Sequence, residues 1–156
     1  NAVRPNTKAF LVESPANPLL EVTAIGAVAE IAHAAGAKLV VDNVFATPIF
    51  QKPLVLGADI VVYSATKHID GQGRVLGGAI LGDAELMTSA YKDMHRHTGP
   101  ALSPFNSWVL LKGLETLELR VRRQTENCGK VANAIAAHSK VKNSSGKMNR
   151  KACSHR

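Results

Sequence analysis

An apolar run in this sequence ends abruptly in polar residues. The run Val61-Val62-Tyr63 favours a buried strand, and Ser64, Thr66 and Lys67 follow within four residues. Two hydroxyl groups beside a lysine suit a bound phosphate. A lysine amine at the mouth of an apolar sheet suits a Schiff base with a carbonyl compound. A phosphate and a carbonyl together indicate pyridoxal phosphate.

A carboxylate upstream of the lysine fits the same hypothesis. Asp42 closes the short apolar run 38–41, so we expect its carboxylate to be partly desolvated. A pyridinium nitrogen nearby would keep the carboxylate ionised and would itself stay protonated. The alternatives are structural: Asp42 as a turn residue, Ser64 and Thr66 as caps, and Lys67 as a surface side chain.

The elements around these residues predict an α/β fold. Short apolar runs alternate with helical patterns, which favours a mostly parallel sheet with helices on both faces. Ligands of such sheets bind beyond the carboxyl ends of the strands. Thr23 is predicted to cap the first helix and Gly36 to end it. We expect strands over 8–13, 38–42, 59–63 and 75–81, a helical turn over 51–56, and helices over 24–35, 83–95, 103–118 and 120–137.

The net charge of +7 is concentrated at one end of the chain. Residues 1–137 carry 13 Lys and Arg against 12 Asp and Glu, whereas 138–156 carry six basic residues and no acidic one. We therefore predict a folded part of a cofactor-binding domain over 1–137, ending in a long helix. We predict a disordered or artefactual basic tail over 138–156. The tail could bind polyanions electrostatically, but we expect no specific nucleic-acid partner.

Several function classes lack support in the sequence. No apolar run approaches the roughly 20 residues of a membrane span, and no secretory signal opens the chain. Cys128 and Cys153 form no disulfide framework, which favours a cytoplasmic protein. No metal motif is present, and the glycines of 71–78 do not match a nucleotide-binding loop. The first residue is not Met, so we expect a piece of a longer chain.

The quoted residues are similar in order and spacing to the Cys/Met-metabolism pyridoxal-phosphate enzymes, which act in transsulfuration. The likeness covers about residues 5–138, and it implies the large domain of a fold-type-I transferase. Two further segments, 69–74 and 98–108, look most like the O-succinylhomoserine sulfhydrylase branch. The matching motifs are Glu13-Ser14-Pro15-Ala16-Asn17-Pro18, Val40-Val41-Asp42-Asn43-Val44-Phe45-Ala46-Thr47-Pro48, Gln51-Lys52-Pro53-Leu54, Gly57-Ala58-Asp59-Ile60-Val61-Val62 and Tyr63-Ser64-Ala65-Thr66-Lys67.

The resemblance implies a role for each matched residue. Lys67 would carry pyridoxal phosphate and move protons, and Asp42 would pair with the pyridinium nitrogen. Ser64 and Thr66 would bind the phosphate. Asn17 would hydrogen-bond the phenolic oxygen of the cofactor. Ser103 and Arg74 would line the substrate pocket.

The implied reaction is a γ-replacement on O-succinylhomoserine, an amino-acid substrate, in which sulfide displaces succinate to give homocysteine. The alternatives are cystathionine γ-synthase, with cysteine as the sulfur donor, and a γ- or β-lyase. Family members are longer and are expected to be homotetramers with shared sites. An alternative of another class is an inactive fragment whose tail binds polyanions.

Overall fold

The computed structural model describes residues 2–141. The chain divides into two compact units, residues 1–117 and 118–156, and each is described by itself. The basic tail predicted over 138–156 lies mostly outside the described residues.

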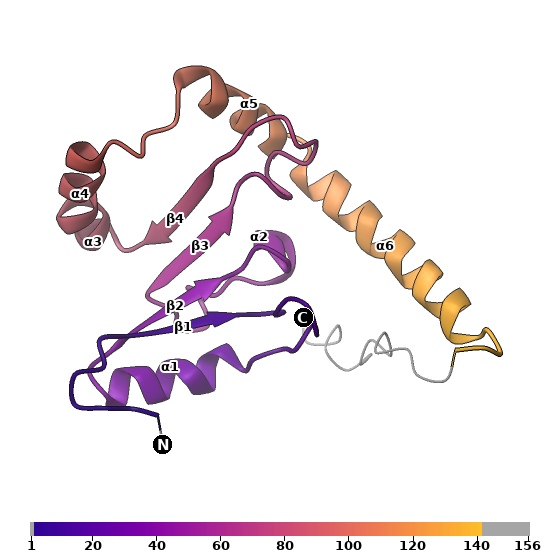
Figure 1. Cartoon of the computed structure of the whole chain (residues 1–156), viewed down its shortest axis with the longest axis horizontal. Helices are drawn as coiled ribbons and strands as arrows, with labels where there is room; N and C mark the ends of the chain where they lie inside the picture. Colours follow the sequence, from indigo (N-terminus) through magenta and orange to yellow (C-terminus); the bar gives the residue numbers. More distant parts are fainter. Residues whose placement is uncertain (1, 142–156) are drawn as a thin grey trace. The chain divides into compact units, whose positions relative to one another are not determined.

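The first unit contains a four-stranded sheet in the order β1-β2-β3-β4 (Figure 1). Strands β1 (Ala9–Glu13), β2 (Lys38–Asp42) and β3 (Ile60–Ser64) are parallel, and β4 (Gly78–Gly82) is antiparallel to β3. The predicted mostly parallel α/β sheet is confirmed. Because β1, β2 and β3 run the same way, their carboxyl ends share one edge of the sheet, as the site hypothesis requires.

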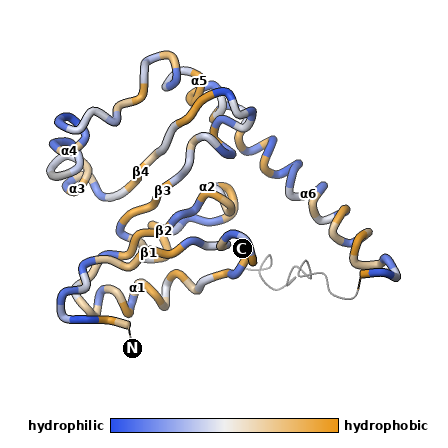
Figure 2. The backbone as a smooth tube through the Cα atoms, viewed as in Figure 1, coloured by the Kyte–Doolittle hydropathy of each residue, from blue (hydrophilic) through white to orange (hydrophobic). Residues whose placement is uncertain are grey.

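One face of this sheet is packed against α1 (Ile25–Ala34). Alternate strand residues point to opposite faces, so β2 and β3 each send two side chains into the same core. Hydrophobic residues predominate in the strands, and several of the connecting loops are hydrophilic (Figure 2). The buried core consists of Ile25, Ala29, Ala32, Leu39, Val41, Ala58, Val61 and Tyr63.

The opposite face of the sheet carries apolar side chains that remain accessible. Leu11 is 74% exposed and Ile80 is 42% exposed, both at positions that alternate with the core residues. Asp42 and Ser64 belong to this second face. The strands therefore place core residues on one face and the predicted site residues on the other.

The remaining helices of the first unit differ in detail from the prediction. They are α2 (Thr47–Phe50), α3 (Ala84–Thr88), α4 (Ala90–Thr98) and α5 (Pro104–Leu114). The helix predicted over 83–95 is split at Ser89, whose backbone is not helical. The helical turn predicted over 51–56 is present as turns over 53–57, where Leu56 N–H donates to the Pro53 carbonyl at 3.0 Å. The short helix α2 was not predicted; it begins at Thr47, directly before a proline that suits a first helical turn.

The predicted cap of α1 is wrong, whereas its predicted end is confirmed. The backbone N–H of Thr23 donates to the Ser14 hydroxyl at 3.0 Å, and the N-cap position is taken by Ala24 without a side-chain cap. Thr23 is thus used to tie the loop after β1. Gly36 follows the helix with φ of 66°, a left-handed conformation that glycine adopts without steric cost.

The second unit consists of most of α6 (Leu117–Ala136). Its surface carries ion pairs one turn apart, including Arg122 with Glu118 at 2.8 Å and Lys130 with Glu126 at 2.6 Å. Such exposed pairs are screened by solvent and add little to the stability of a helix. The hydrogen bonds from Lys130 and Arg123 hold the pKa of Glu126 below its usual value.

Candidate active site at the carboxyl edge of the sheet

Lys67 lies in a tight turn that follows β3 directly. Its backbone N–H donates to the Ser64 carbonyl at 3.1 Å, and its own carbonyl accepts from Gly71 N–H at 2.7 Å. A third backbone hydrogen bond closes the same turn: Asp70 N–H donates to the Ala65 carbonyl at 2.8 Å. The side chain of Lys67 is exposed, and its amine makes no hydrogen bond or ion pair within residues 2–141. The backbone of the predicted Schiff-base lysine is therefore fixed while its amine stays available.

Thr66 is attached to the start of β4. Its hydroxyl accepts a hydrogen bond from Gly77 N–H at 3.1 Å and makes only a long contact, 3.4 Å, to the Gly77 carbonyl. The acceptor role of the hydroxyl is thus used, and its proton can turn to an anion at little cost. The Ser64 hydroxyl has no hydrogen-bond partner in the described part of the chain. Two hydroxyl donors beside the turn suit a phosphate.

Asp42 is the last residue of β2, and one of its two carboxylate oxygens is hydrogen-bonded. Oδ1 accepts from Val44 N–H at 3.0 Å, and Oδ2 has no partner among residues 2–141. Asp42 is opposite Val62 in β3, so Ser64, two residues further on, points to the same face of the sheet. A half-buried carboxylate with one open oxygen can accept a hydrogen bond from a protonated ring nitrogen.

Asn17 belongs to the loop that leaves β1 at the same edge. Glu13, the last residue of β1, is opposite Asp42, and its Oε2 accepts from Asn17 N–H at 3.3 Å. The Asn17 side chain is exposed and can reach a ligand at this edge. The topology thus brings Asn17, Asp42, Ser64, Thr66 and Lys67 to one edge, from three strand ends and the turn after β3.

The two predicted substrate residues have structural partners. Arg74 Nε donates to Asp70 Oδ1 at 2.8 Å, with the Arg74 side chain 40% exposed. The Ser103 hydroxyl caps α5 by accepting from Asn106 N–H at 3.1 Å. Neither contact uses every hydrogen-bonding atom of the side chain, so both side chains remain candidates for substrate contact.

A buried polar network that the sequence did not predict lies beneath this edge. Asn43 is fully buried, and its Nδ2 donates to the Tyr63 hydroxyl at 2.8 Å and to the Gln51 carbonyl at 2.9 Å. Gln51 Nε2 donates to Asn43 Oδ1 and to the Ser14 carbonyl, each at 2.8 Å. Burial raises the pKa of the Tyr63 phenol, with the Asn43 hydrogen bond acting in the opposite direction.

This network holds the carboxyl ends of the three parallel strands in a fixed arrangement. Through Gln51 and Asn43, it joins the residue after β1, the residue after β2 and Tyr63 near the end of β3. Asn43 follows Asp42 directly, so the two side chains face opposite sides of the sheet, one toward the core and one toward the site. The position of Asn43, directly after the strand-end Asp42, was the only sign of this network in the sequence. Its partner Tyr63 is 20 residues away in the chain, so the contact could not be predicted from local pattern.

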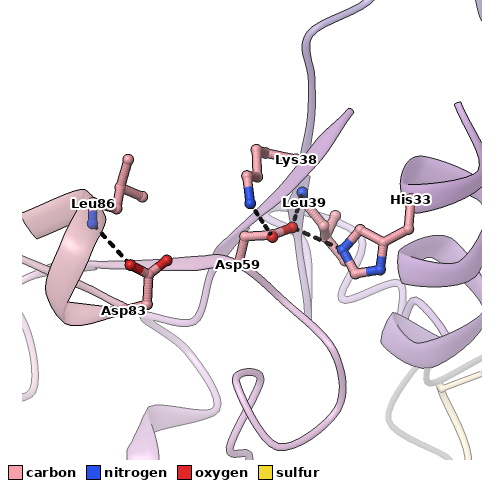
Figure 3. Close-up of polar contacts among 6 residues, drawn as sticks. All are labelled: His33, Lys38, Leu39, Asp59, Asp83 and Leu86. Atoms are coloured by element: carbon pink, nitrogen blue, oxygen red, sulfur yellow. Dashed lines mark hydrogen bonds and ion pairs between the residues drawn. The ribbon is translucent and has the colours of Figure 1, made fainter. Parts of the chain in front are cut away.

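A second polar cluster lies at the opposite, amino edge of the sheet (Figure 3). Asp59 Oδ2 accepts from Leu39 N–H at 2.8 Å and contacts His33 Nε2 at 2.9 Å, and Oδ1 accepts from Lys38 at 2.9 Å. Burial opposes ionisation of Asp59, but these hydrogen bonds outweigh it and lower its pKa to about 2. The hydrogen bond to Asp59 also raises the pKa of Lys38. Both oxygens accept hydrogen bonds, and these contacts join α1, β2 and the residue before β3.

Comparison with known proteins identifies the family. The sequence profile of the Cys/Met metabolism PLP-dependent enzymes matches residues 1–145. The chain belongs to this family. The cofactor of the family is pyridoxal phosphate, and the open hydroxyls and carboxylate oxygen described above suit its phosphate and ring nitrogen.

Curated relatives within the family are also similar over most of the chain. O-succinylhomoserine sulfhydrylase of Mycobacterium tuberculosis is 56% identical over 87% of the chain, and that of Pseudomonas aeruginosa is 59% identical over 78%. Cystathionine gamma-lyase of Bacillus subtilis is 44% identical over 90%. These alignments cover 34%, 30% and 37% of the relatives, so the chain spans about a third of their length.

Solved structures agree with the fold. The metB protein of Corynebacterium glutamicum matches with a TM-score of 0.87 and 39% identity, over 91% of this chain and 37% of that one. Cystathionine gamma-lyase of Lactobacillus plantarum, solved with L-serine, matches with a TM-score of 0.85 and 37% identity, over 88% and 36%. The α/β fold of a family large domain is thereby shown.

No group of three or more His, Cys, Asp or Glu side chains in the described ranges is arranged to hold a metal ion. Among the same residues, no helix combines the length and the apolar character of a membrane span.

Proposed function

We propose that this chain forms the lysine-bearing part of an enzyme that replaces the γ-substituent of O-succinylhomoserine with sulfide. The observation that carries the proposal is the placement of Asp42 and Ser64 on one face of the sheet, with Thr66 and Lys67 in the turn that follows. Identity of 56–59% to O-succinylhomoserine sulfhydrylases, against 41–44% to lyases and cystathionine gamma-synthase, favours this branch.

The roles of the residues follow from their chemistry. Lys67 would hold the cofactor through its amine, and a free lysine amine at this position would be a base able to move protons at two neighbouring substrate carbons. Asp42 keeps the ring nitrogen protonated, and the Ser64 and Thr66 hydroxyls donate to the phosphate. Pyridoxal phosphate, when bound, supplies the electron sink for carbanion chemistry.

The remaining roles extend the site to its rim. Asn17 hydrogen-bonds the phenolic oxygen of the cofactor, and Arg74 and Ser103 contact the substrate. An accessible rim is consistent with an amino-acid substrate that must enter and leave.

The test of the cofactor site uses the 156-residue chain and a matched variant. The chain is titrated with pyridoxal phosphate, the visible absorbance of the lysine-bound cofactor is followed, and the adduct is reduced with borohydride. We expect the label on Lys67, and its loss in Lys67→Ala but not in Lys52→Ala, which removes a lysine outside the site. A visible band that persists in Lys67→Ala, with no label on Lys67 in the parent chain, contradicts the proposal.

The reaction is proposed for a protein of the relatives' length that contains this segment. We expect residues 1–156 by themselves to have little or no turnover, because the similar enzymes are about three times as long. Initial rates with O-succinylhomoserine and either sulfide or cysteine then separate the proposed sulfhydrylase from cystathionine γ-synthase. Turnover without any added thiol indicates a γ-lyase instead.

The setting proposed for this enzyme is a cytoplasmic homotetramer that acts in methionine biosynthesis. The exposed free thiol of Cys128 is consistent with a reducing compartment. Sedimentation analysis of the same longer protein tests the tetramer.

A further inference from the structure

The loop that follows Lys67 is closed by a buried carboxylate. Asp70 is 0% exposed, and its Oδ2 accepts from Arg74 N–H at 2.6 Å and from Gln72 N–H at 3.3 Å. Its Oδ1 accepts from Arg74 Nε at 2.8 Å, and the Asp70 carbonyl accepts from Arg74 Nη2 at 3.2 Å. Burial opposes ionisation of this carboxyl, but the hydrogen bonds from Arg74 and Gln72 outweigh burial and lower its pKa. A buried carboxylate with this many donors fixes the backbone around it.

The same residue is tied to the turn that carries the lysine. Asp70 N–H donates to the Ala65 carbonyl, and the next residue, Gly71, donates to the Lys67 carbonyl. On the other side of Lys67, Ala65 N–H and the Thr66 hydroxyl are bonded to Gly77, at 2.9 Å and 3.1 Å respectively. The backbone is therefore hydrogen-bonded on both sides of Lys67, through Asp70 after it and through Gly77 to the residues before it.

Helix α5 supports this turn through Gly113. A Cβ placed on Gly113 would overlap the Ile69 carbonyl oxygen and lie 3.2 Å from Asp70 Cα. The obstacles are backbone atoms, which cannot move aside as the tip of a side chain can. Residue 113 must therefore be glycine for α5 to approach the turn this closely.

We propose that Asp70 is a positioning residue for Lys67, acting with Arg74 and Gly113 to hold the lysine turn against α5. This inference rests on the proposed function of Lys67. The cofactor must meet the Lys67 amine and the Thr66 hydroxyl at the same time. A fixed turn keeps these two groups at one separation, so attachment to the lysine gains from a pre-ordered phosphate contact. Asp70 itself needs no contact with the cofactor.

The experiment measures where pyridoxal phosphate attaches on the 156-residue chain. After borohydride reduction, peptide mass spectrometry gives the ratio of label on Lys67 to label on Lys52, a lysine outside the site. We expect Asp70→Asn and Gly113→Ala to lower this ratio by about tenfold, the scale of a modest loss of orientation. Arg74→Lys, which keeps the charge and loses the two-point contact, should retain more of the ratio than Arg74→Ala.

Two matched variants control for the substitutions themselves. Gly26→Ala changes a glycine within α1 whose added Cβ meets nothing closer than Leu56 O at 3.7 Å. Asp83→Asn changes an aspartate that caps α3 by accepting from Leu86 N–H at 2.8 Å (Figure 3). Both should leave the labelling ratio within about twofold, because neither residue is hydrogen-bonded to the lysine turn. Circular dichroism at the labelling temperature verifies that each variant compared is folded.

The outcomes separate this inference from the proposed function. If the unmodified chain shows no preference for Lys67, the proposed function itself fails. If that preference exists and folded Asp70→Asn and Gly113→Ala keep it, the positioning role is overturned. Should Asp70→Asn not fold, the comparison of Gly113→Ala with Gly26→Ala and of Arg74→Lys with Arg74→Ala decides the question.

Discussion

The two edges of the sheet use aspartates differently. At the amino edge, the Asp59 carboxylate accepts hydrogen bonds from three groups, namely Leu39 N–H, His33 and Lys38, and its side chain is 14% exposed. At the carboxyl edge, Asp42 has one backbone donor and an open oxygen. The Asp59 carboxylate, with both oxygens hydrogen-bonded, joins elements of the fold, whereas the Asp42 carboxylate, with one oxygen open, retains the capacity to bind a ligand. Of these two aspartates, only Asp42 keeps an oxygen that a ligand could use.

The largest expected effect comes from making the same substitution at both edges. Asp42→Asn removes the charge that holds a protonated ring nitrogen, so we expect pyridoxal phosphate to bind at least about tenfold more weakly, with stability nearly unchanged. Asp59→Asn should do the reverse: it should lower the free energy of unfolding by about 1–2 kcal/mol, since two charge-assisted contacts are weakened. Cofactor titration and urea denaturation of both variants measure the two effects. Equal losses of affinity in both variants would contradict the comparison.

Much of this comparison was accessible from the sequence. Apolar runs ending in Asp42 and in Ser64 to Lys67 predicted the parallel strands, their common edge and the candidate cofactor residues. The Asp59 cluster at the other edge was not predicted, because His33, Lys38 and Asp59 come from three separate segments and their contacts depend on strand register. The Asn43 network was not predicted for the same reason, because its members also come from separate segments of the chain. Local pattern indicates which residue ends a strand, but the partners of a buried polar group are set by tertiary packing.

The helix predictions failed at two points. Thr23 has the side chain of a good N-cap, yet α1 starts one residue later, with Ala24 at the N-cap position. The pattern over 83–95 is continuous in the sequence, yet the helix breaks at Ser89. Helix propensity is a weak preference that packing often overrides.

A smaller effect is expected on the acid limb of stability. The pKa of Asp59 is lowered from 3.8 to about 2 in the folded chain, so the unfolded chain takes up a proton first as the pH falls. The stabilisation is present above about pH 4 and is lost as the pH falls toward 2. We expect a loss of about 1–2 kcal/mol from this group after allowing for solvent screening.

Urea denaturation measures this effect at several pH values between about 6 and 2.5, the range over which such a group titrates. As the pH falls, the free energy of unfolding of Asp59→Asn should decrease less steeply than that of the unmodified chain. The acid limb should not vanish, because the pKa of Asp70 is also lowered. Asp42→Asn is the matched variant at the other edge, and an equal flattening in that variant would remove the distinction between the two aspartates.

The smallest effect is expected at Ser103, which tests whether the carboxyl-edge site extends to α5. As the N-cap of this helix, its hydroxyl accepts from Asn106 N–H at 3.1 Å, so Ser103→Ala should cost about 1 kcal/mol of stability. Ser103→Asp keeps a capping oxygen and should restore that stability. If Ser103 only caps the helix, Ser103→Asp should also restore the KM for the amino-acid substrate in a protein of the relatives' length. If it contacts the substrate as well, the added carboxylate should raise KM even though the helix is stable, because a carboxylate repels the substrate's own carboxylate. Restored stability together with a raised KM would therefore show that the substrate site includes the start of α5. Restoration of both stability and KM would show that Ser103 only caps the helix.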